Sequence, residues 1–159
     1  MATAARQQAS AGNDNLDLEA QFCFALYSAT LALGKTYAPI LAELRLTYPQ
    51  YIVMLVLWQE DGLTVRALGE QLHLNSGTLT PMLKRMEQAG LVRRSRDKKD
   101  ERLVRTELTQ AGRDLRARAQ HIPCTVAEAI GLPTDKLAQI KDELQGIRQS
   151  LEAGAAILV

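Results

Sequence analysis

The sequence predicts a mainly helical protein that carries one small β-hairpin, and three observations support this. Aromatic residues make up only 4% of the chain, while Ala, Leu, Gln and charged residues that favour helices are common. Apolar residues recur every three or four positions in stretches that begin at capping residues. Two short strand-like runs, LVRRSR and RLVRTEL, are joined by the charged segment DKKDE, as expected for a hairpin. A chain of 159 residues can form one domain with its own core.

The first helix is expected between about residues 18 and 44. Residues 1–16 are small and polar, and we expect them to be disordered. Pro39 is expected to kink or divide the helix near its end. The apolar positions that define the helix are Phe22, Leu26, Leu33, Ile40 and Leu44.

The second helix begins at the sequence TYPQ, residues 47–50, which has the pattern of a capping box with proline in the first turn. It continues through YIVMLVLWQE and stops at Asp61-Gly62. Because this segment is apolar nearly all round, we expect it in the core. Met54 and Trp58 are interpreted as packing residues with no functional role.

Two short helices follow. Thr64 is placed to cap VRALGEQL, and Asn75 or Ser76 to cap the segment that ends in KRMEQAG, with only HLN or so between them. This length pattern is typical of a helix-turn-helix, whose second helix enters the DNA major groove, although it also fits an ordinary helical hairpin. The β-hairpin that comes next favours a winged helix-turn-helix. Its cationic tip fits either a soluble turn or contact with phosphates or a narrow minor groove.

The last third of the chain is expected to hold two further helices. Thr109 opens one that runs through ARAQHIP, and Thr134 caps the other, DKLAQIKDELQGIRQSLEAG. Pro123 and the GLP at residues 131–133 are expected to break the region between them. The terminal helices exceed what a winged helix needs, so their apolar surface suggests a second copy of the chain. The expected organisation is a tail at 1–16 and one domain at 17–159, with a DNA-binding part at 47–108 and dimerisation helices at 17–46 and 109–159.

Charge is distributed unevenly along the chain. The formal net charge is +1, but residues 84–118 hold twelve Lys and Arg against six Asp and Glu. A local basic segment suits DNA as well as a solvated surface, so charge alone does not decide between them.

Several classes of function find no support in the sequence. No apolar run approaches the length of a membrane span and the first dozen residues lack a signal-peptide core, so we expect a cytoplasmic protein without membrane contact. Cys23 and Cys124 have no metal-site or C-x-x-C spacing, and His73 and His121 are too few and too separated for a metal. No Ser/His/Asp set or phosphate-binding loop is visible. We therefore expect neither a cofactor nor an enzyme.

The chain resembles the MarR family of winged-helix repressors, and within it the branch of organic hydroperoxide resistance regulators, OhrR. The resemblance covers about residues 20–115. The matching segments are QFCFALYS, TYPQYIVMLVLW, LTVRALGEQL, NSGTLTPMLKRMEQAGLV and DERLVRTELTQAG. The DER of the wing and the LT-x-x-G after it mark the family, and a cysteine in the first helix with tyrosines downstream marks the peroxide-sensing branch.

This resemblance implies a homodimer that binds a palindromic operator and represses a peroxide-detoxification gene. It implies release when Cys23 is oxidised by an organic hydroperoxide, with Tyr37 and Tyr48 as hydrogen-bond donors to the thiolate and Tyr27 as a closer neighbour in sequence. Fourteen residues of helix separate Tyr37 from Cys23 by about 21 Å, so one straight helix cannot bring them together. They can meet only across a dimer, whereas Tyr27 lies on the same face as Cys23 four residues on.

The roles of the two cysteines have alternatives. Among apolar neighbours Cys23 fits plain packing, which would raise its thiol pKa, and tyrosine donors oppose that effect. Cys124 fits a resolving cysteine that forms an intersubunit disulfide with Cys23, or a buried bystander. Two other functions remain open: a repressor released by a reversible small aromatic ligand, and, with less support, a thiol peroxidase.

DNA contacts are expected from two elements of the winged helix. On the recognition helix the candidates are Asn75, Ser76, Thr78, Thr80 and Lys84, of which the early polar residues reach base edges and the lysine meets phosphate. On the wing the candidates are Lys98, Lys99 and Arg102. The family resemblance implies that Asp100 orients Arg102 rather than touching DNA.

Overall fold

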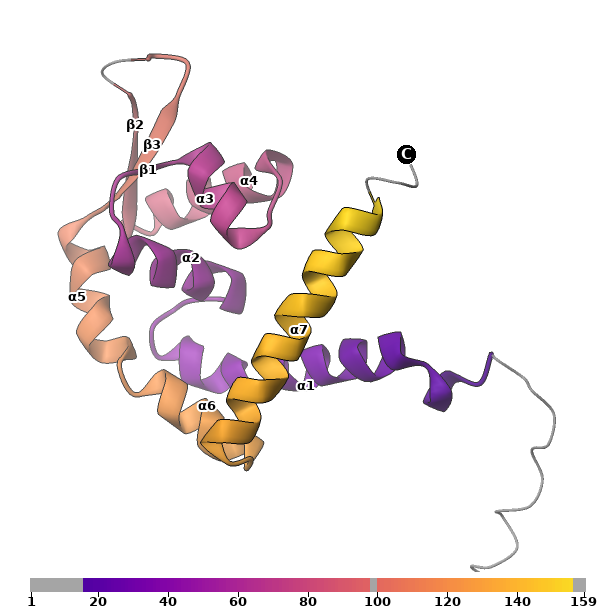
Figure 1. Ribbon diagram of the computed structural model, residues 1–159. Helices are drawn as coiled ribbons and strands as arrows, with labels where there is room; N and C mark the ends of the chain where they lie inside the picture. The colour runs from indigo at the N-terminus through magenta and orange to yellow at the C-terminus, as the bar shows by residue number, and fades with distance from the viewer. Residues whose placement is uncertain (1–15, 98–99, 156–159) are drawn as a thin grey trace, which may run out of the picture. The chain divides into compact units, whose positions relative to one another are not determined.

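The computed structural model describes residues 16–97 and 100–155. The chain divides into two compact units, Met1–Thr36 and Tyr37–Val159, which are described separately. The tail expected at 1–16 lies, apart from Leu16, outside the described residues, and so do Lys98 and Lys99, which the sequence analysis assigned to the wing. The elements are η1 Leu18–Ala20, α1 Phe22–Ala42, α2 Tyr48–Gln59, β1 Leu63–Thr64, α3 Val65–Leu72, α4 Ser76–Gln88, β2 Val92–Arg96, β3 Val104–Leu108, α5 Gln110–Ala119, α6 Ile122–Ile130 and α7 Thr134–Ala155 (Figure 1).

The first unit contains η1 and most of α1. Asp17 caps η1 by accepting a hydrogen bond from the Glu19 amide, and extended backbone at Gln21 separates η1 from α1. The single helix expected from residue 18 is therefore two segments. Pro39, in the part of α1 that belongs to the second unit, does not divide the helix. Pro39 has no backbone N–H to donate within the helix. It lies only one turn before the helix ends, so little of the helix follows this missing hydrogen bond.

Helix α2 begins as the sequence predicts. The Gln50 amide donates to Thr47 Oγ1, and the Thr47 amide donates to Gln50 Oε1, so the capping box is complete. Tyr51, Val53, Met54 and Leu57 are buried. Trp58 is only half-buried, so α2 turns one face to the core and is not surrounded by it.

Helices α3 and α4 form the expected helix-turn-helix. Thr64 caps α3 and Asn75 caps α4. The turn is tight, because a Cβ at Gly69 would lie 2.7 Å from the Leu74 carbonyl oxygen. A side chain at Gly69 would therefore push the two helices apart. His73 ends α3 in the left-handed region, with φ of 53°.

The wing is a three-stranded antiparallel sheet in the order β1-β3-β2. The hairpin of β2 and β3 was predicted, and its register pairs Val92 with Leu108 and Arg96 with Val104. The two-residue strand β1 was not predicted. It pairs Leu63 with Thr106, and it is too short to show an alternating pattern in the sequence.

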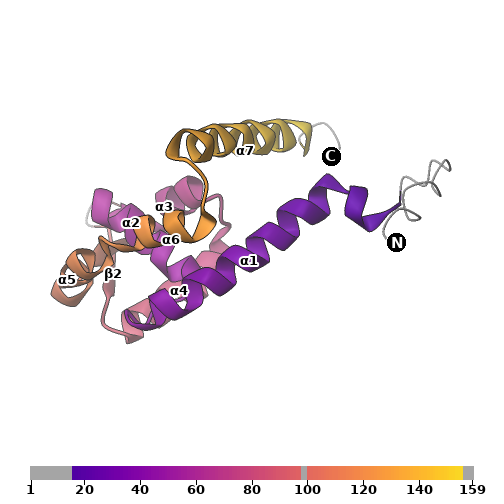
Figure 2. The same cartoon turned by 90° about the horizontal axis from the view of Figure 1, so that it is seen from below.

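The region after the wing differs from the prediction. One helix was expected from Thr109 through residue 123, but α5 ends at Ala119 and α6 begins at Ile122 (Figures 1 and 2). Pro123 does not break a helix; it occupies the first turn of α6, where a missing amide hydrogen costs no helical bond. Gly131 then ends α6 with φ of 71°.

The core of the second unit lies among α2, α3, α4 and the wing sheet, with contributions from α5 and α6. Its fully buried large apolar side chains are Leu41, Tyr51, Val53, Met54, Leu57, Leu68, Leu79, Leu83, Met86, Val92 and Ile122. The architecture confirms the predicted class, mainly α with a β-hairpin wing in a winged helix-turn-helix. Among the described helices, none has the length and apolar character of a membrane span.

Candidate functional site

The first turn of α4 presents the polar side chains predicted to read DNA. Ser76 and Thr78 are exposed, Thr80 is half-buried, and Lys84 is exposed one turn further on. Asn75 precedes the helix and uses its side-chain oxygen to accept a 2.9 Å hydrogen bond from the Thr78 amide. Only the amide nitrogen of Asn75 is then left to donate to a base, since its oxygen satisfies the helix terminus.

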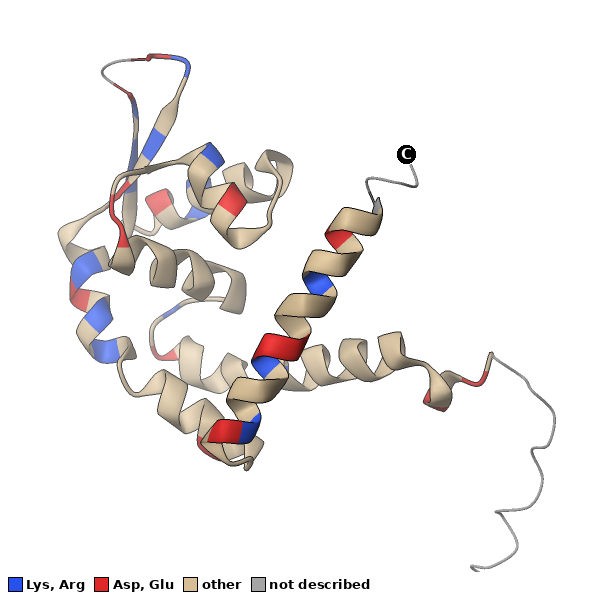
Figure 3. Cartoon of the chain, viewed as in Figure 1, with Lys and Arg blue, Asp and Glu red and all other residues tan. Residues whose placement is uncertain are grey.

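A groove of about 700 Å³ separates the start of α4 from the wing and α3. Ser76 and Thr80 line it from α4, and Arg94 and Arg102 from the wing. Figure 3 shows Lys and Arg along both strands of the wing and on α5, in agreement with the basic segment found in the sequence. Hydroxyl groups on a helix beside a cationic hairpin suit a polyanion whose base edges and phosphates are contacted together.

Arg102 stands on the loop of the wing and is held by one carboxylate. Its Nε and Nη2 each donate a 3.0 Å hydrogen bond to Asp100, and its side chain is 89% exposed. These bonds, with one from the Arg102 amide, hold the pKa of the Asp100 carboxyl below its ordinary value. The guanidinium is therefore oriented but accessible. Asp97, which is buried, pairs with Arg105 and accepts from the Asp100 amide at 3.0 Å, so the loop is anchored to β3.

A second ion pair, which the sequence analysis missed, joins the recognition helix to the wing. Glu87 near the end of α4 accepts 2.9 Å bonds from the amide and Nε of Arg94 in β2, and a 2.7 Å bond from its Nη2. The amide bond and then the side-chain bonds lower the pKa of Glu87. The seven-residue separation gave no signal, because only the α4–β2 turn brings the two residues together.

Tyrosines from α1 and α2 form a cluster within the second unit. The ring centroids of Tyr37 and Tyr48 are 4.5 Å apart, and Tyr51 lies 6.0 Å from Tyr37. Burial, and then the two neighbouring phenols, raise the pKa of Tyr37 above its ordinary value of 10.0, so its hydroxyl remains a donor at neutral pH. The structure thus brings together two of the three tyrosines that the sequence analysis singled out, Tyr37 and Tyr48. Tyr51 was missed, although it lies three residues after Tyr48 on the same helix.

The cysteines occupy different units. Cys23 lies in the first turn of α1, in the first unit, with Tyr27 one helical turn later, and both are exposed in the single chain. Cys124 lies on α6, in the second unit, and is also exposed with a free thiol.

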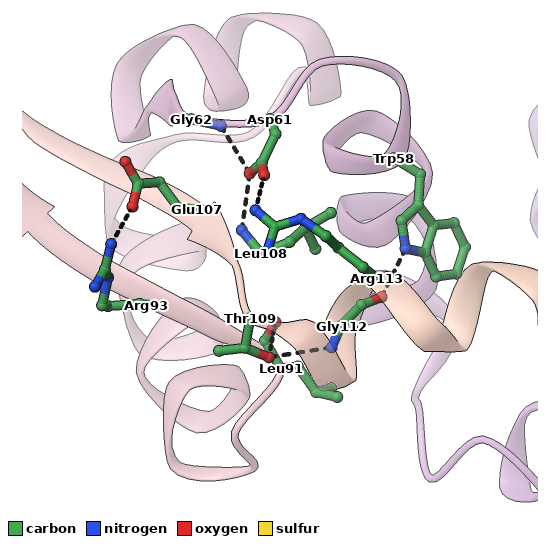
Figure 4. A network of polar contacts seen from close by, with 10 residues as sticks. All are labelled: Trp58, Asp61, Gly62, Leu91, Arg93, Glu107, Leu108, Thr109, Gly112 and Arg113. Carbon is green, nitrogen blue, oxygen red and sulfur yellow. Dashed lines mark hydrogen bonds and ion pairs between the residues drawn. The ribbon is translucent and has the colours of Figure 1, made fainter.

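A polar network ties the start of α5 to the rest of the winged helix (Figure 4). The indole N–H of Trp58 donates to the Gly112 carbonyl at 2.9 Å. Asp61 accepts from the Leu108 amide at 2.8 Å and from Arg113 at 2.7 Å. Trp58 therefore does more than fill space, which its apolar neighbours in the sequence did not reveal. Within residues 16–97 and 100–155, no group of His, Cys, Asp and Glu could hold a metal ion.

Comparisons with known proteins agree with this geometry. A family model described as transcriptional regulator SarA/Rot matches residues 35–118. The HTH-type transcriptional regulator TtmR of Methylorubrum extorquens is 47% identical over 143 residues, 90% of this chain and 73% of the relative. The organic hydroperoxide resistance transcriptional regulator of Bacillus subtilis is 46% identical over 138 residues, 87% of this chain and 94% of the relative. These matches are regulators, which confirms the expectation that the chain is not an enzyme.

Solved structures of AbfR, a Staphylococcus epidermidis protein, are also similar. Reduced AbfR bound to DNA is 37% identical with a TM-score of 0.68, over 86% of this chain and 95% of that one. Overoxidized AbfR bound to DNA is 32% identical with a TM-score of 0.70, over 85% and 96%. Disulfide-formed AbfR is 37% identical with a TM-score of 0.59, over 86% and 93%.

Proposed function

Since the chain belongs to the MarR/SarA family of winged-helix transcriptional regulators, we propose that it is a repressor that senses organic hydroperoxides through Cys23. Oxidation of this cysteine releases operator DNA and derepresses a peroxide-detoxification gene. The relative from Bacillus subtilis is named for organic hydroperoxide resistance, which supports this signal for the present chain.

The observation that carries the proposal is the contact between Tyr37 and Tyr48, whose ring centroids are 4.5 Å apart. Two phenols from different helices provide two hydroxyl donors in one place. Donors directed at sulfur favour the thiolate, which is the form that attacks peroxides. In the proposed dimer these phenols face Cys23 of the partner subunit, and Tyr27 assists from the same chain as Cys23.

A dimer is supported by apolar side chains that stay exposed on the terminal helices. They are Phe22, Leu26, Leu31, Ile130, Leu144 and Leu151, and Leu132 between α6 and α7 is exposed as well. Large apolar surfaces of this kind on helices outside the DNA-reading part suit burial against an identical chain. A two-fold dimer also places two recognition helices on half-sites about one turn of DNA apart.

The proposed chemistry has two steps. The Cys23 thiolate attacks the terminal oxygen of the hydroperoxide, the O–O bond breaks, and the alkoxide takes a proton to leave as an alcohol, so that Cys23 becomes a sulfenic acid. The Cys124 thiol of the partner subunit then attacks this sulfur, forming a disulfide and releasing water. The exposure of both thiols supports each step.

We assign operator release to the second step. AbfR is described as bound to DNA when overoxidized, so overoxidation is compatible with DNA binding in that relative. A disulfide demands more, because its two α-carbons must approach within about 7 Å. In a dimer that approach shifts helices of both subunits and moves the two recognition helices out of register with successive major grooves.

Operator contact is assigned to residues of two elements, α4 and the wing. The start of α4 supplies base contacts through Asn75, Ser76, Thr78 and Thr80, while Lys84 meets phosphate. The wing supplies Arg102, oriented by Asp100, and the neighbouring Lys98 and Lys99, which lie outside the described residues.

The proposal is tested by the reactivity of Cys23 as a function of pH, measured in a Cys124→Ser background so that one thiol reports. We expect fast alkylation and fast oxidation by cumene hydroperoxide at pH 7, and slower alkylation and oxidation in Tyr37→Phe and Tyr48→Phe. A slowly reacting thiol in the parent protein would contradict the proposal and favour release by a reversible ligand.

A further inference from the structure

Trp58 connects α2 to the first turn of α5. It is the only tryptophan in the chain and is half-buried. Its indole N–H donates a 2.9 Å hydrogen bond to the Gly112 carbonyl (Figure 4). Its ring meets Tyr51 edge-on, with 6.3 Å between the ring centroids. The residue therefore makes one aromatic contact on α2 and one polar contact on α5.

The aromatic contact leads to the tyrosine pair. Tyr51 is 2% exposed and lies 6.0 Å from Tyr37, which in turn lies 4.5 Å from Tyr48. The interior around Tyr51 is packed, so a displaced Tyr37 ring changes the space available to the Tyr51 ring. Four rings thus form a continuous series from the proposed thiolate donors to Trp58.

The polar contact leads to the wing. A Cβ at Gly112 would lie 2.2 Å from the Leu91 carbonyl oxygen, so the first turn of α5 rests directly on the backbone that precedes β2. Thr109 strengthens this contact: its amide donates to the same carbonyl at 3.1 Å, and its hydroxyl donates to the neighbouring Gly90 carbonyl at 2.6 Å. On the other side Asp61 binds both the end of β3 and Arg113 of α5. A displacement at Gly112 is therefore passed to both strands of the hairpin.

We propose that Trp58 is the positioning residue that couples the tyrosine pair to the wing, through Tyr51 on one side and the Gly112 carbonyl on the other. This inference rests on the proposed function, since it assigns the route by which a change at Tyr37 and Tyr48 reaches the DNA-reading elements. Trp58 touches neither the sulfur nor the DNA in this role.

The native protein offers a direct test, because its tryptophan fluorescence comes from Trp58 alone. We expect the emission of the wild type to change when cumene hydroperoxide oxidises it, and to return on reduction with dithiothreitol. The Cys23→Ser variant, treated in the same way, is the matched control and is expected to show no change.

The second test is Trp58→Phe, which keeps an aromatic ring against Tyr51 and removes the N–H donor. We expect normal operator affinity when reduced and a normal rate of thiol oxidation. The difference in operator affinity between the reduced and oxidised forms should shrink about fivefold, the factor that corresponds to one neutral hydrogen bond. Urea unfolding checks that the variant folds, and the fluorescence test stands without it.

The outcomes separate the inference from the proposed function. A wild type that keeps its operator affinity after oxidation contradicts the proposed function and the coupling with it. A wild type that releases DNA with unchanged Trp58 emission overturns the coupling alone. The same holds for a folded Trp58→Phe variant whose response equals that of the wild type.

Discussion

Replacing Gly112 with alanine should disturb the junction between α5 and the wing. The added Cβ would lie 2.2 Å from the Leu91 carbonyl oxygen and 3.1 Å from Leu108 Cδ2. The nearest obstacle is backbone rather than the end of a flexible side chain. The first turn of α5 or the Leu91 carbonyl must therefore move by about 1 Å to restore van der Waals distance.

The change in the free energy of unfolding combines two destabilising effects with one stabilising effect. Overpacking against fixed atoms costs about 1–3 kcal/mol. Displacing the Leu91 and Gly112 carbonyl groups weakens the hydrogen bonds that these groups accept from the Thr109 amide and the Trp58 indole, which contribute roughly 0.5–1.5 kcal/mol each. Alanine gains about 1 kcal/mol over glycine in a helix, which offsets part of this. The expected net loss in the free energy of unfolding is about 2 kcal/mol, or about 4–8 °C in Tm for a chain of this size.

The assay is thermal and urea unfolding followed by circular dichroism at one protein concentration, because a dimer makes Tm concentration-dependent. Gly146→Ala on α7 is the matched control, since its Cβ would meet no atom within 4 Å. That control should be as stable as the wild type or gain up to about 1 kcal/mol. If Gly112→Ala behaved like Gly146→Ala, the close packing of α5 on Leu91 would be refuted.

Three further predictions concern the wing and the second cysteine. Arg102→Ala should weaken operator binding by about 1–3 kcal/mol in a fluorescence anisotropy titration. The control variant Arg93→Ala, which removes a cross-strand partner of Glu107, should change operator binding little. Equal losses of binding in the two variants would contradict the role given to Arg102. The Arg94 amide and side chain lower the pKa of Glu87 from 4.5, so the stabilisation that this pair provides is present above about pH 4.5 and is lost as the pH falls through the lowered pKa. Glu87→Gln should therefore lose less stability than the wild type as the pH falls through that range in urea unfolding. An unchanged dependence of stability on acidic pH would speak against the pair. Cys124→Ser should abolish the cross-linked dimer on a non-reducing gel after peroxide treatment, and a persisting cross-link would exclude it as the resolving residue.

Much of the fold could be predicted because its signals are local. The caps Thr47, Thr64, Asn75 and Thr109 lie within a few residues of the amides they bind, so the sequence places the helix starts well. Strand β1 could not be predicted, since its two residues become a strand only by pairing with β3. The start of α6 was mistaken for a break because Pro123 is compatible with both a helix end and a first helical turn.

The candidate site likewise contains some residues that could be predicted from the sequence and others that could not. Family motifs singled out Tyr37 and Tyr48, and the structure brings their rings together. The roles of Tyr51 and Trp58 depend on which helix each side chain faces, and an apolar segment such as α2 carries no periodicity that would reveal it. Glu87 and Arg94 were missed for a related reason, since their contact is made by a turn between a helix and a strand.

The central claim is that oxidation of Cys23 controls operator binding, and a titration of labelled operator DNA with reduced, oxidised and re-reduced protein tests it most directly. We predict tight binding by the reduced protein, loss of binding after treatment with cumene hydroperoxide, and recovery after dithiothreitol. Cys23→Ser should bind equally in all three conditions. Undiminished binding by oxidised wild type, with mass spectrometry confirming the Cys23–Cys124 disulfide, would contradict the claim.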